Sequence, residues 1–185
     1  MKLFELCYTF KWWFWRIKTF LFYKFFFGSI GKRSVICKPM YIAHPENMYL
    51  GNHVRLREFA RVETITNYNG VSFKPKLIID DDTGIEQGCH ITCAESISIG
   101  KGCAITSYVT ITDINHTYED MSILPVDQKL STKPVKIGDY CLIGSGTVIL
   151  PGSEVGDHCI VAANAVLTGK TYPPYSLIGG YQPKL

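Results

Sequence analysis

The chain has 185 residues, a length typical of one domain with a substantial buried core. Apolar residues make up 46% of it and charged residues 19%, which excludes a disordered chain and an integral membrane protein. The net charge is +3, but residues 1–27 carry five Lys or Arg and one Glu, so the rest of the chain sums to −1. A folded body with this charge has no basic stripe, and we expect no binding to nucleic acid.

The N-terminal segment, residues 1–29, is aromatic and basic, and residues 4–27 could form one helix. Residues 1–27 hold 13 of the 24 aromatic side chains. Lysines and an arginine interrupt the apolar stretches, which argues against a signal peptide or a transmembrane helix. At 100° per residue, Lys11 and Lys18 lie opposite Arg16 and Lys24, so the cations do not mark one polar face. Aromatic residues interleaved with cations suit peripheral contact with a membrane surface through residues 1–27, and packing against the body or another subunit is the alternative.

From residue 30 onward an aliphatic residue recurs every six positions, in six groups of three. A small or short side chain stands four positions after the aliphatic one in 14 of the 18 cases. A period of six fits neither an α-helix nor a simple amphipathic strand. The repeating positions are Ile30, Ile36, Ile42, Leu50, Leu56, Val62, Ile79, Ile85, Ile91, Ile99, Ile105, Ile111, Ile137, Ile143, Ile149, Val155, Val161 and Leu167.

This repeat predicts an all-β solenoid, a parallel β-helix with about six triangular coils over residues 30–172, followed by a tail at 173–185. Each hexad is one short strand and a turn, and the aliphatic side chain fills the interior. With coils stacked ~4.8 Å apart, the prism is about 29 Å tall. Glycine often follows the aliphatic residue, as at Gly31, Gly51 and Gly144, which a tight corner favours.

The seven cysteines are an odd number, and no spacing among them resembles a zinc site. Four of them, Cys89, Cys103, Cys141 and Cys159, occupy the small-residue position of the repeat, where Cys behaves as a compact buried apolar residue. We therefore expect reduced thiols, no metal and a cytoplasmic protein.

Two interruptions of the repeat are long. The step from Val62 to Ile79 is 17 residues, and the step from Ile111 to Ile137 is 26, so residues 113–134 form an excursion loop. Long excursions from a rigid scaffold are where function concentrates. This one begins with Thr-Asp-Ile-Asn-His, which makes His116 the candidate functional histidine, whereas the solvent-facing interpretation suits the other histidines His44, His53 and His158.

The segment from Ile137 to Leu167, IGDYCLIGSGTVILPGSEVGDHCIVAANAVL, resembles the hexapeptide-repeat acyltransferases, which fold as left-handed β-helices. Within that superfamily, TDINHTYED followed by PVDQKLSTKPVKIGD is similar to the polysaccharide and lipopolysaccharide O-acetyltransferases. The resemblance implies transfer of acetyl from acetyl-CoA, as co-substrate, to a hydroxyl of a sugar or glycan. It also implies a homotrimer with active sites between neighbouring prisms.

A sugar hydroxyl is too weakly acidic to attack a thioester unaided, and an imidazole can remove its proton at neutral pH. We therefore expect His116 to be the general base. Asp113 and Asn115 either hold the acceptor hydroxyl or form only a turn, and Asp113 could instead orient the imidazole. Glu86 and His90, which lie about one coil below, are further candidates for the acceptor pocket.

The resemblance also implies residues for coenzyme A. The backbone N–H in the corner at Ser145 would stabilise the thioester oxyanion. Ala163 matches the residue beside the pantetheine arm and Thr168 the residue in the following corner. Lys170 stands one position beyond the usual phosphate-binding lysine, and Lys184 lies in a C-terminal motif that departs from the family pattern, as a weaker candidate for the 3′-phosphate.

Two other functions remain open at this point. One is an N-acyltransferase acting on a nucleotide-linked amino sugar, and the other is a β-helix scaffold without catalysis, because a fold alone does not imply activity. A peripheral position on the inner face of the membrane would suit an acceptor that is a lipid-linked glycan.

Overall fold

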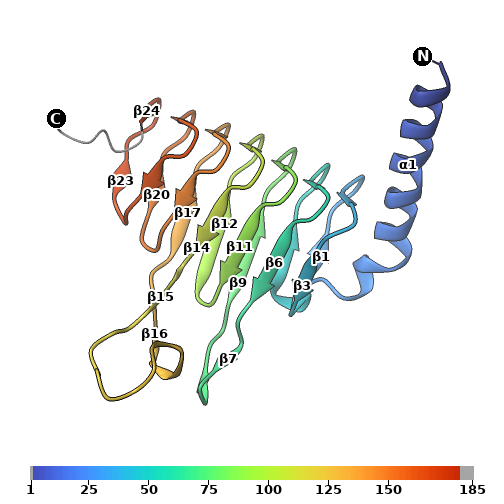
Figure 1. Cartoon of the computed structure of the whole chain (residues 1–185). Helices are drawn as coiled ribbons and strands as arrows, with labels where there is room; N and C mark the ends of the chain where they lie inside the picture. The colour runs from blue at the N-terminus through green and yellow to red at the C-terminus, as the bar shows by residue number, and fades with distance from the viewer. Residues whose placement is uncertain (1, 180–185) are drawn as a thin grey trace.

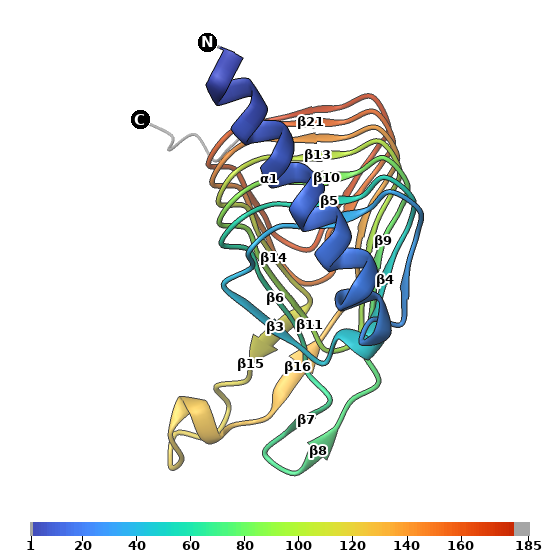
Figure 2. The same ribbon diagram turned by 90° about the vertical axis from the view of Figure 1, so that its right-hand side faces the viewer.

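The computed structural model describes the backbone of residues 2–179 and the side chains from residue 9 onward. Its body is a stack of triangular coils (Figures 1 and 2). Three sheets of seven, seven and six strands form the sides of this prism. Every pair within them is parallel and joins equivalent strands of adjacent coils, as Ile85 pairs with Leu56 below and Ile105 above. The structure confirms the predicted all-β solenoid with an N-terminal helix.

We call the three sides sheet A, sheet B and sheet C. Sheet A contains β1 (Ser29–Ile30), β4 (Met48–Leu50), β9 (Lys76–Ile79), β12 (Ser96–Ile99), β17 (Val135–Ile137), β20 (Glu154–Val155) and β23 (Thr171–Tyr172). Sheet B contains β2 (Val35–Ile36), β5 (Arg55–Leu56), β10 (Gly84–Ile85), β13 (Ala104–Ile105), β18 (Leu142–Ile143), β21 (Ile160–Val161) and β24 (Leu177–Ile178). Sheet C contains β3 (Tyr41–Ala43), β6 (Arg61–Thr64), β11 (His90–Cys93), β14 (Thr110–Thr112), β19 (Val148–Ile149) and β22 (Val166–Leu167).

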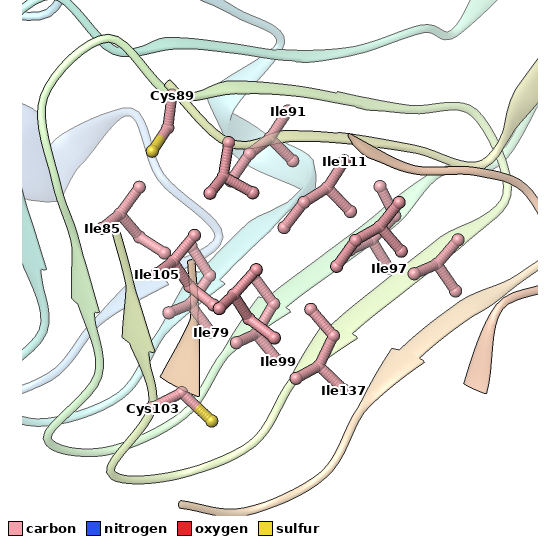
Figure 3. Packing of buried hydrophobic residues seen from close by; sticks show 14 of the residues in the cluster. Ile79, Ile85, Cys89, Ile91, Ile97, Ile99, Cys103, Ile105, Ile111 and Ile137 are labelled. Carbon is pink, nitrogen blue, oxygen red and sulfur yellow. The ribbon is translucent and has the colours of Figure 1, made fainter. Parts of the chain in front are cut away.

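The repeating aliphatic residues fill the interior of the prism, and Figure 3 shows isoleucines from the three sheets meeting there. Sixteen of the eighteen positions are buried. The two exceptions, Ile30 and Ile42, are half-buried because they belong to the first coil, which has a neighbouring coil on one side only. The cysteines of the small-residue position are buried as expected, with Cys89, Cys103, Cys141 and Cys159 at most 2% exposed.

The residues that make the turns are not the glycines that were predicted to make them. The left-handed residue of a turn directly precedes the small buried residue, as with Phe59 (φ 61°) before Ala60. The glycines that follow the aliphatic residue have another purpose, which is close stacking. A Cβ on Gly144 would lie 2.4 Å from the backbone nitrogen of Ala163 in the next coil, which no side chain tolerates.

The prism ends later than the sequence predicts. β24, at Leu177–Ile178, pairs with β21 and lies within the segment 173–185 that was expected to be a tail. The step from Leu167 to the next inward residue, Tyr172, is five residues and replaces an aliphatic residue with an aromatic one. The shortened step and the change of residue type hide this seventh coil from a search for a strict period of six.

The N-terminal helix α1 (Lys2–Leu21) lies across the end of the prism beside the first coil, and a 3-10 turn, η1 (Tyr23–Phe25), follows it (Figure 2). Thr19 anchors the helix because its buried hydroxyl accepts the backbone N–H of Ile36 at 2.9 Å. The helix therefore packs on the prism, as one of the two alternatives expects. Within the described residues, no helix is long and apolar enough to cross a membrane.

Both long interruptions of the repeat form hairpins at the edge between sheets C and A (Figures 1 and 2). The first, β7 (Asn67–Tyr68) and β8 (Val71–Ser72), follows β6, and the second, β15 (Ile114–His116) and β16 (Leu130–Thr132), follows β14. A 3-10 turn, η3 (Pro125–Asp127), lies within the second excursion, and η2 (Pro45–Asn47) precedes β4. The hairpins contact each other, because the Tyr68 hydroxyl donates a hydrogen bond to the carbonyl of Val126.

Candidate active site

His116 lies at the end of β15 and lines a cavity of about 320 Å³ on the outside of sheet C. Its ring meets the ring of Tyr68 edge to face, with centroids 5.6 Å apart. The two hairpins therefore bring His116 and Tyr68 together, although 48 residues separate them in the sequence. His90 lines the same cavity, which places two of the predicted residues in one site.

The opposite wall of the cavity is formed by the outward side chains of three adjacent strands. On β11, His90 and Thr92 flank the inward Ile91, and the register aligns them with Arg61 and Glu63 of β6 and with Thr110 and Thr112 of β14. Because alternate residues of a strand face opposite sides, all these polar side chains lie on the outer face of sheet C. The cavity lining is Glu63, Ile65, Tyr68, His90, Thr92, Thr110, Thr112, Ile114, His116 and Leu130.

Glu63 is the acid of this wall, and the sequence analysis missed it. Its carboxylate accepts hydrogen bonds from the Arg61 guanidinium at 3.0 and 3.1 Å and from the Thr92 hydroxyl at 3.2 Å. The Nε2 atom of His90 lies 3.5 Å from the carboxylate and 3.0 Å from the Thr92 hydroxyl. The sequence does place Glu63 on the outer face, because the residues on both sides of an inward aliphatic residue, here Val62, must point outward.

Asn115 lies on the other side of the β15 strand from the polar wall. It lines a second hollow, of about 460 Å³, together with His116, Tyr118, Glu119 and neighbouring residues. His116 thus borders both cavities, whereas Asn115 borders only the outer one. Its backbone carbonyl accepts a hydrogen bond from Ser131 of β16, 3.4 Å away.

The prediction that Asp113 binds an acceptor or orients His116 is wrong. Its side chain is fully buried, and its two carboxylate oxygens accept the backbone N–H groups of Ala94, Glu95 and Ser96, each at 2.8 Å. Asp113 therefore fixes the corner between β11 and β12 to the first residue of the excursion. It acts on the site as the anchor from which the hairpin with His116 begins.

The corner residues assigned to the oxyanion and the pantetheine arm lie along the edge between sheets B and C. Ser145 and Ala163 are exposed and belong to adjacent coils, and the Asn164 N–H donates to the Ser145 carbonyl at 2.8 Å. Glu86 lies on this same edge, directly after β10, where it faces Arg57 at 3.8 Å. Within one chain Glu86 does not line the cavity of His116 and His90, and its role in the acceptor pocket stays a prediction.

Thr168 and Lys170 lie instead on the edge between sheets C and A, directly after β22, and both are exposed. Ser145, Ala163, Thr168 and Lys170 all lie outside the lining of the His116 cavity. The single chain therefore does not assemble the complete predicted set around His116. Lys184 lies outside the described residues.

Three of the buried thiols, those of Cys37, Cys89 and Cys93, are poor nucleophiles. Burial raises the pKa of Cys89 to about 11 and that of Cys37 to about 11, because the thiolate would lose its hydration. Burial likewise raises the pKa of Cys93, and the carboxylate of Asp113 raises it further. No cysteine is among the residues that line the His116 cavity, so the chemistry of the site falls to the histidines and the polar side chains around it.

The architecture is that of a left-handed β-helix acyltransferase. The model of the bacterial transferase hexapeptide family (six repeats) matches residues 134–169. Among solved structures, AntD, an N-acyltransferase from Bacillus cereus in complex with dTDP and 3-hydroxybutyryl-CoA, superimposes with a TM-score of 0.69. That match covers 85% of this chain and 81% of AntD at 18% identity, so it concerns the fold.

Curated relatives narrow the class further. The chain is 31% identical over 147 residues to the putative lipopolysaccharide biosynthesis O-acetyl transferase WbbJ of Escherichia coli (strain K12), covering 76% of this chain and 68% of the relative. It is 26% identical to the galactoside O-acetyltransferase of the same organism, covering 83% of this chain and 60% of that enzyme. The chain belongs to the hexapeptide-repeat transferase family, and the prediction that it is an acetyltransferase is confirmed.

Proposed function

We propose that the protein transfers the acetyl group of acetyl-CoA to a hydroxyl of a sugar or glycan, with His116 as general base. The observation that carries this proposal is the position of His116 opposite Glu63, His90 and Thr92 in one cavity. A wall with a carboxylate, an imidazole and hydroxyls offers acceptors and donors to the several hydroxyls of a sugar. The similarity to WbbJ, named a putative O-acetyl transferase, and to galactoside O-acetyltransferase supports the same choice.

In the proposed reaction the imidazole of His116 removes the proton of the acceptor hydroxyl while its oxygen attacks the thioester carbonyl. The tetrahedral intermediate carries a negative oxygen, which a backbone N–H stabilises. Collapse of the intermediate breaks the C–S bond, and the imidazolium returns its proton to the leaving thiolate. The products are the acetyl ester and coenzyme A, and His116 is again neutral.

The site is completed by a neighbouring copy in a homotrimer. His116 comes from the edge between sheets C and A, whereas Ser145 and Ala163 lie on the edge between sheets B and C and outside the His116 cavity. A second prism can bring its own corner with Ser145 and Ala163 to the first prism's His116. In this arrangement Thr168 and Lys170 lie on the edge that carries His116, where Lys170 would face a phosphate of coenzyme A.

Mixing two inactive variants tests this shared site. His116→Ala removes the base, and Ala163→Trp fills the proposed pantetheine groove from an exposed position that tolerates a large side chain. In randomly mixed trimers, a site with an intact His116 from one copy and an intact Ala163 from its neighbour forms with a probability of about one quarter. We expect co-refolded mixtures to regain about a quarter of the wild-type activity. A mixture that stays inactive, or an active monomer in sedimentation, contradicts the shared site.

The bond formed in the product distinguishes O-acetylation from the alternative of N-acylation of a nucleotide-linked amino sugar. N-acylation is the second candidate because the carboxylate of Glu63 in the cavity would also suit an amino group. The N-acyltransferase AntD has a similar fold. The test is transfer of radioactive acetyl to a panel of glycans and amino sugars, followed by mild treatment with alkaline hydroxylamine. An ester loses its label and an amide keeps it. We expect loss of label, and no transfer to any acceptor would favour the scaffold without catalysis.

A further inference from the structure

The helix α1 is apolar on two opposite sides, and the prism covers one of them. Thr19 is buried, and Trp12 and Trp15, which share its side of the helix, are half-buried. The opposite side repeats apolar residues at spacings of three and four, and these project away from the prism. With the apolar residues that follow the helix, they are 51–79% exposed: Phe10, Trp13, Phe14, Phe20, Leu21, Phe22, Phe25 and Phe26.

Eight large apolar side chains on one short stretch are unusual for a surface that faces water. A helix that is apolar on all sides is normally covered on all sides. Contiguous exposed apolar surface of this kind marks a docking site, whereas single exposed apolar residues do not. The end of the prism therefore carries a surface that requires a second phase or partner.

The charge around this surface identifies the partner. From residue 6 to residue 45 the sequence contains seven Lys or Arg and no Asp or Glu. Only Lys11 of these seven has an ion pair among the described residues, with Glu58 at 2.6 Å. Six cations have no acidic partner in the described part of the chain: Arg16, Lys18, Lys24, Lys32, Arg33 and Lys38.

A cavity of about 520 Å³ is lined by both apolar side chains and cations. It lies between the end of α1 and the corner at residues 30–34, and its apolar lining includes Ile17, Phe20 and Leu21. Four cations also line it, and no acidic residue does. The four are Arg16, Lys24, Lys32 and Arg33. An apolar hollow lined with cations fits a phosphate that is joined to hydrocarbon.

We propose that the exposed side of α1 and this cavity dock onto a bilayer that contains anionic phospholipids. The aromatic side chains enter the layer between headgroups and acyl chains, and the cations bind the lipid phosphates. A second copy of the chain is a poor partner, because a symmetric contact would place the same unpaired cations against each other. In the proposed trimer, three such surfaces at the same end of the molecule would bind one membrane together and strengthen the attachment.

Tryptophan fluorescence can test this surface directly, because the three tryptophans of the chain, Trp12, Trp13 and Trp15, all lie in α1. Trp13 is on the exposed side, and the other two are half-buried toward the prism. Vesicles of phosphatidylcholine with about 30% phosphatidylglycerol, made with brominated acyl chains, serve as the probe. We expect strong quenching and a blue shift for a Trp12→Phe/Trp15→Phe variant, which retains Trp13. A Trp13→Phe variant, which retains the inner pair, should be quenched much less.

Sedimentation with the same vesicles tests the charges and the aromatic side chains separately. Lys24→Gln/Lys32→Gln should weaken binding about tenfold or more, because each cation near an anionic surface contributes roughly fivefold. The matched control, Lys74→Gln/Lys136→Gln, removes two exposed lysines elsewhere and should bind like wild type. Trp13→Ser/Phe20→Ser should weaken binding at least tenfold. Its control, Leu177→Ser, changes an exposed apolar residue at the far end of the prism and should have no effect.

Several results would overturn the proposal. Wild-type protein that does not bind the anionic vesicles, or that binds pure phosphatidylcholine equally and without any effect of salt, excludes anionic lipid as the partner. Equal quenching of Trp13 and the inner pair would mean that α1 leaves the prism, which contradicts docking of the folded surface. Self-association of the wild-type protein without lipid, together with a monodisperse Trp13→Ser/Phe20→Ser variant, would identify a second copy as the partner. These outcomes do not depend on acetyl transfer.

Discussion

The interior of the coils and the edge between sheets C and A follow opposite rules. Inside, one residue type at one spacing is repeated, and Ile85, Ile105 and Ile143 occupy equivalent places in adjacent coils. At the edge, the repeat is interrupted twice, and the two interruptions fold into hairpins that meet each other and carry His116 and Tyr68. The periodic part of the chain builds a rigid wall, and the parts that break the period bring chemistry to it.

The outer face of sheet C belongs to both regions. Its strands are held in register by the core, which aligns Glu63 with Thr92 and with Thr112 on the outside. The cavity forms where the hairpin with His116 stands beside this aligned wall. A substitution inside the prism should therefore affect stability first, and one at the edge should affect catalysis first. This separation can be tested in both directions.

The largest expected effect is on catalysis without an effect on folding. His116→Ala should lower kcat about 10²- to 10⁴-fold, because it removes proton transfer, while coenzyme A affinity stays nearly constant. The measurements are the rate of coenzyme A release, calorimetric binding of coenzyme A and the melting temperature. His53→Asn is the control, because it changes an exposed histidine far from the cavity to a residue that tolerates its left-handed backbone (φ 55°). A His116→Ala enzyme with more than a third of wild-type activity would contradict the role of base.

The opposite result is expected in the core. Ile105→Ala removes a fully buried side chain at the centre of the stack and should lower the free energy of unfolding by about 2–5 kcal/mol. The folded fraction should retain its kcat, because Ile105 lies inside the prism. Chemical denaturation gives the stability, and coenzyme A release gives the rate. Leu142→Ala, on the outside of a neighbouring strand, is the control and should cost under about 1 kcal/mol.

The sequence predicts the periodic interior of the prism well and the edge with the hairpins less completely. The period of six predicted the three sides, the buried positions and the places where both hairpins leave the prism. It did not predict β24, because a five-residue step to Tyr172 precedes that strand. It also assigned the glycines after the aliphatic residues to the turn itself, whereas close stacking of coils requires them.

The site was predicted less completely because its residues act through neighbours in space. His116 was identified from the excursion, and His90 lies on its cavity as expected. Asp113 looked functional because it stands near His116 in the sequence, but its carboxylate is used by three backbone amides. Glu63 was overlooked although the repeat places it on the outer face, since only the contact between hairpins shows which outward residues border the cavity.

Asp113 connects the two regions, and its removal should affect both stability and rate. Asp113→Ala leaves three buried or half-buried N–H groups of residues 94–96 without their acceptor, which should cost about 2–3 kcal/mol of stability. We also expect kcat to fall roughly tenfold, because the hairpin with His116 begins at this anchor. Denaturation and coenzyme A release measure the two effects. Asp120→Ala is the control, because Asp120 is exposed and its carboxylate accepts hydrogen bonds from Ser122, two residues away. A stable Asp113→Ala variant would contradict the anchor.

A smaller effect is expected from the contact between the hairpins. Tyr68→Phe keeps the ring beside His116 but removes the hydrogen bond to the Val126 carbonyl, which should weaken the local contact between the two hairpins by about 0.5–1.5 kcal/mol. We expect a decrease in kcat of a few fold, with an unchanged melting temperature for the prism as a whole. Steady-state kinetics are the measurement, and Tyr175→Phe, at a distant exposed corner, should match wild type. A full-rate Tyr68→Phe enzyme would show that the hydrogen bond to the Val126 carbonyl does not help to hold His116.

The smallest expected effect concerns the junction between α1 and the prism and depends on pH. Burial opposes ionisation of Glu58, but hydrogen bonds from Lys11 and Arg57 outweigh it and hold its pKa at about 2, below the ordinary value of 4.5. A carboxyl with a lowered pKa in the folded state stabilises the fold fully above about pH 4.5, and this contribution is lost as the pH falls toward 2. Glu58 is only partly shielded from solvent, so Glu58→Gln should lower the melting temperature by about 1–3 °C at pH 7. The difference from wild type should stay constant down to about pH 5 and shrink steadily below it. Glu119→Gln, which changes an exposed carboxylate of the excursion loop, should leave the melting temperature unchanged across this range. A difference for Glu58→Gln that persists or grows as the solution is acidified would show that Glu58 does not stabilise this junction through its charge.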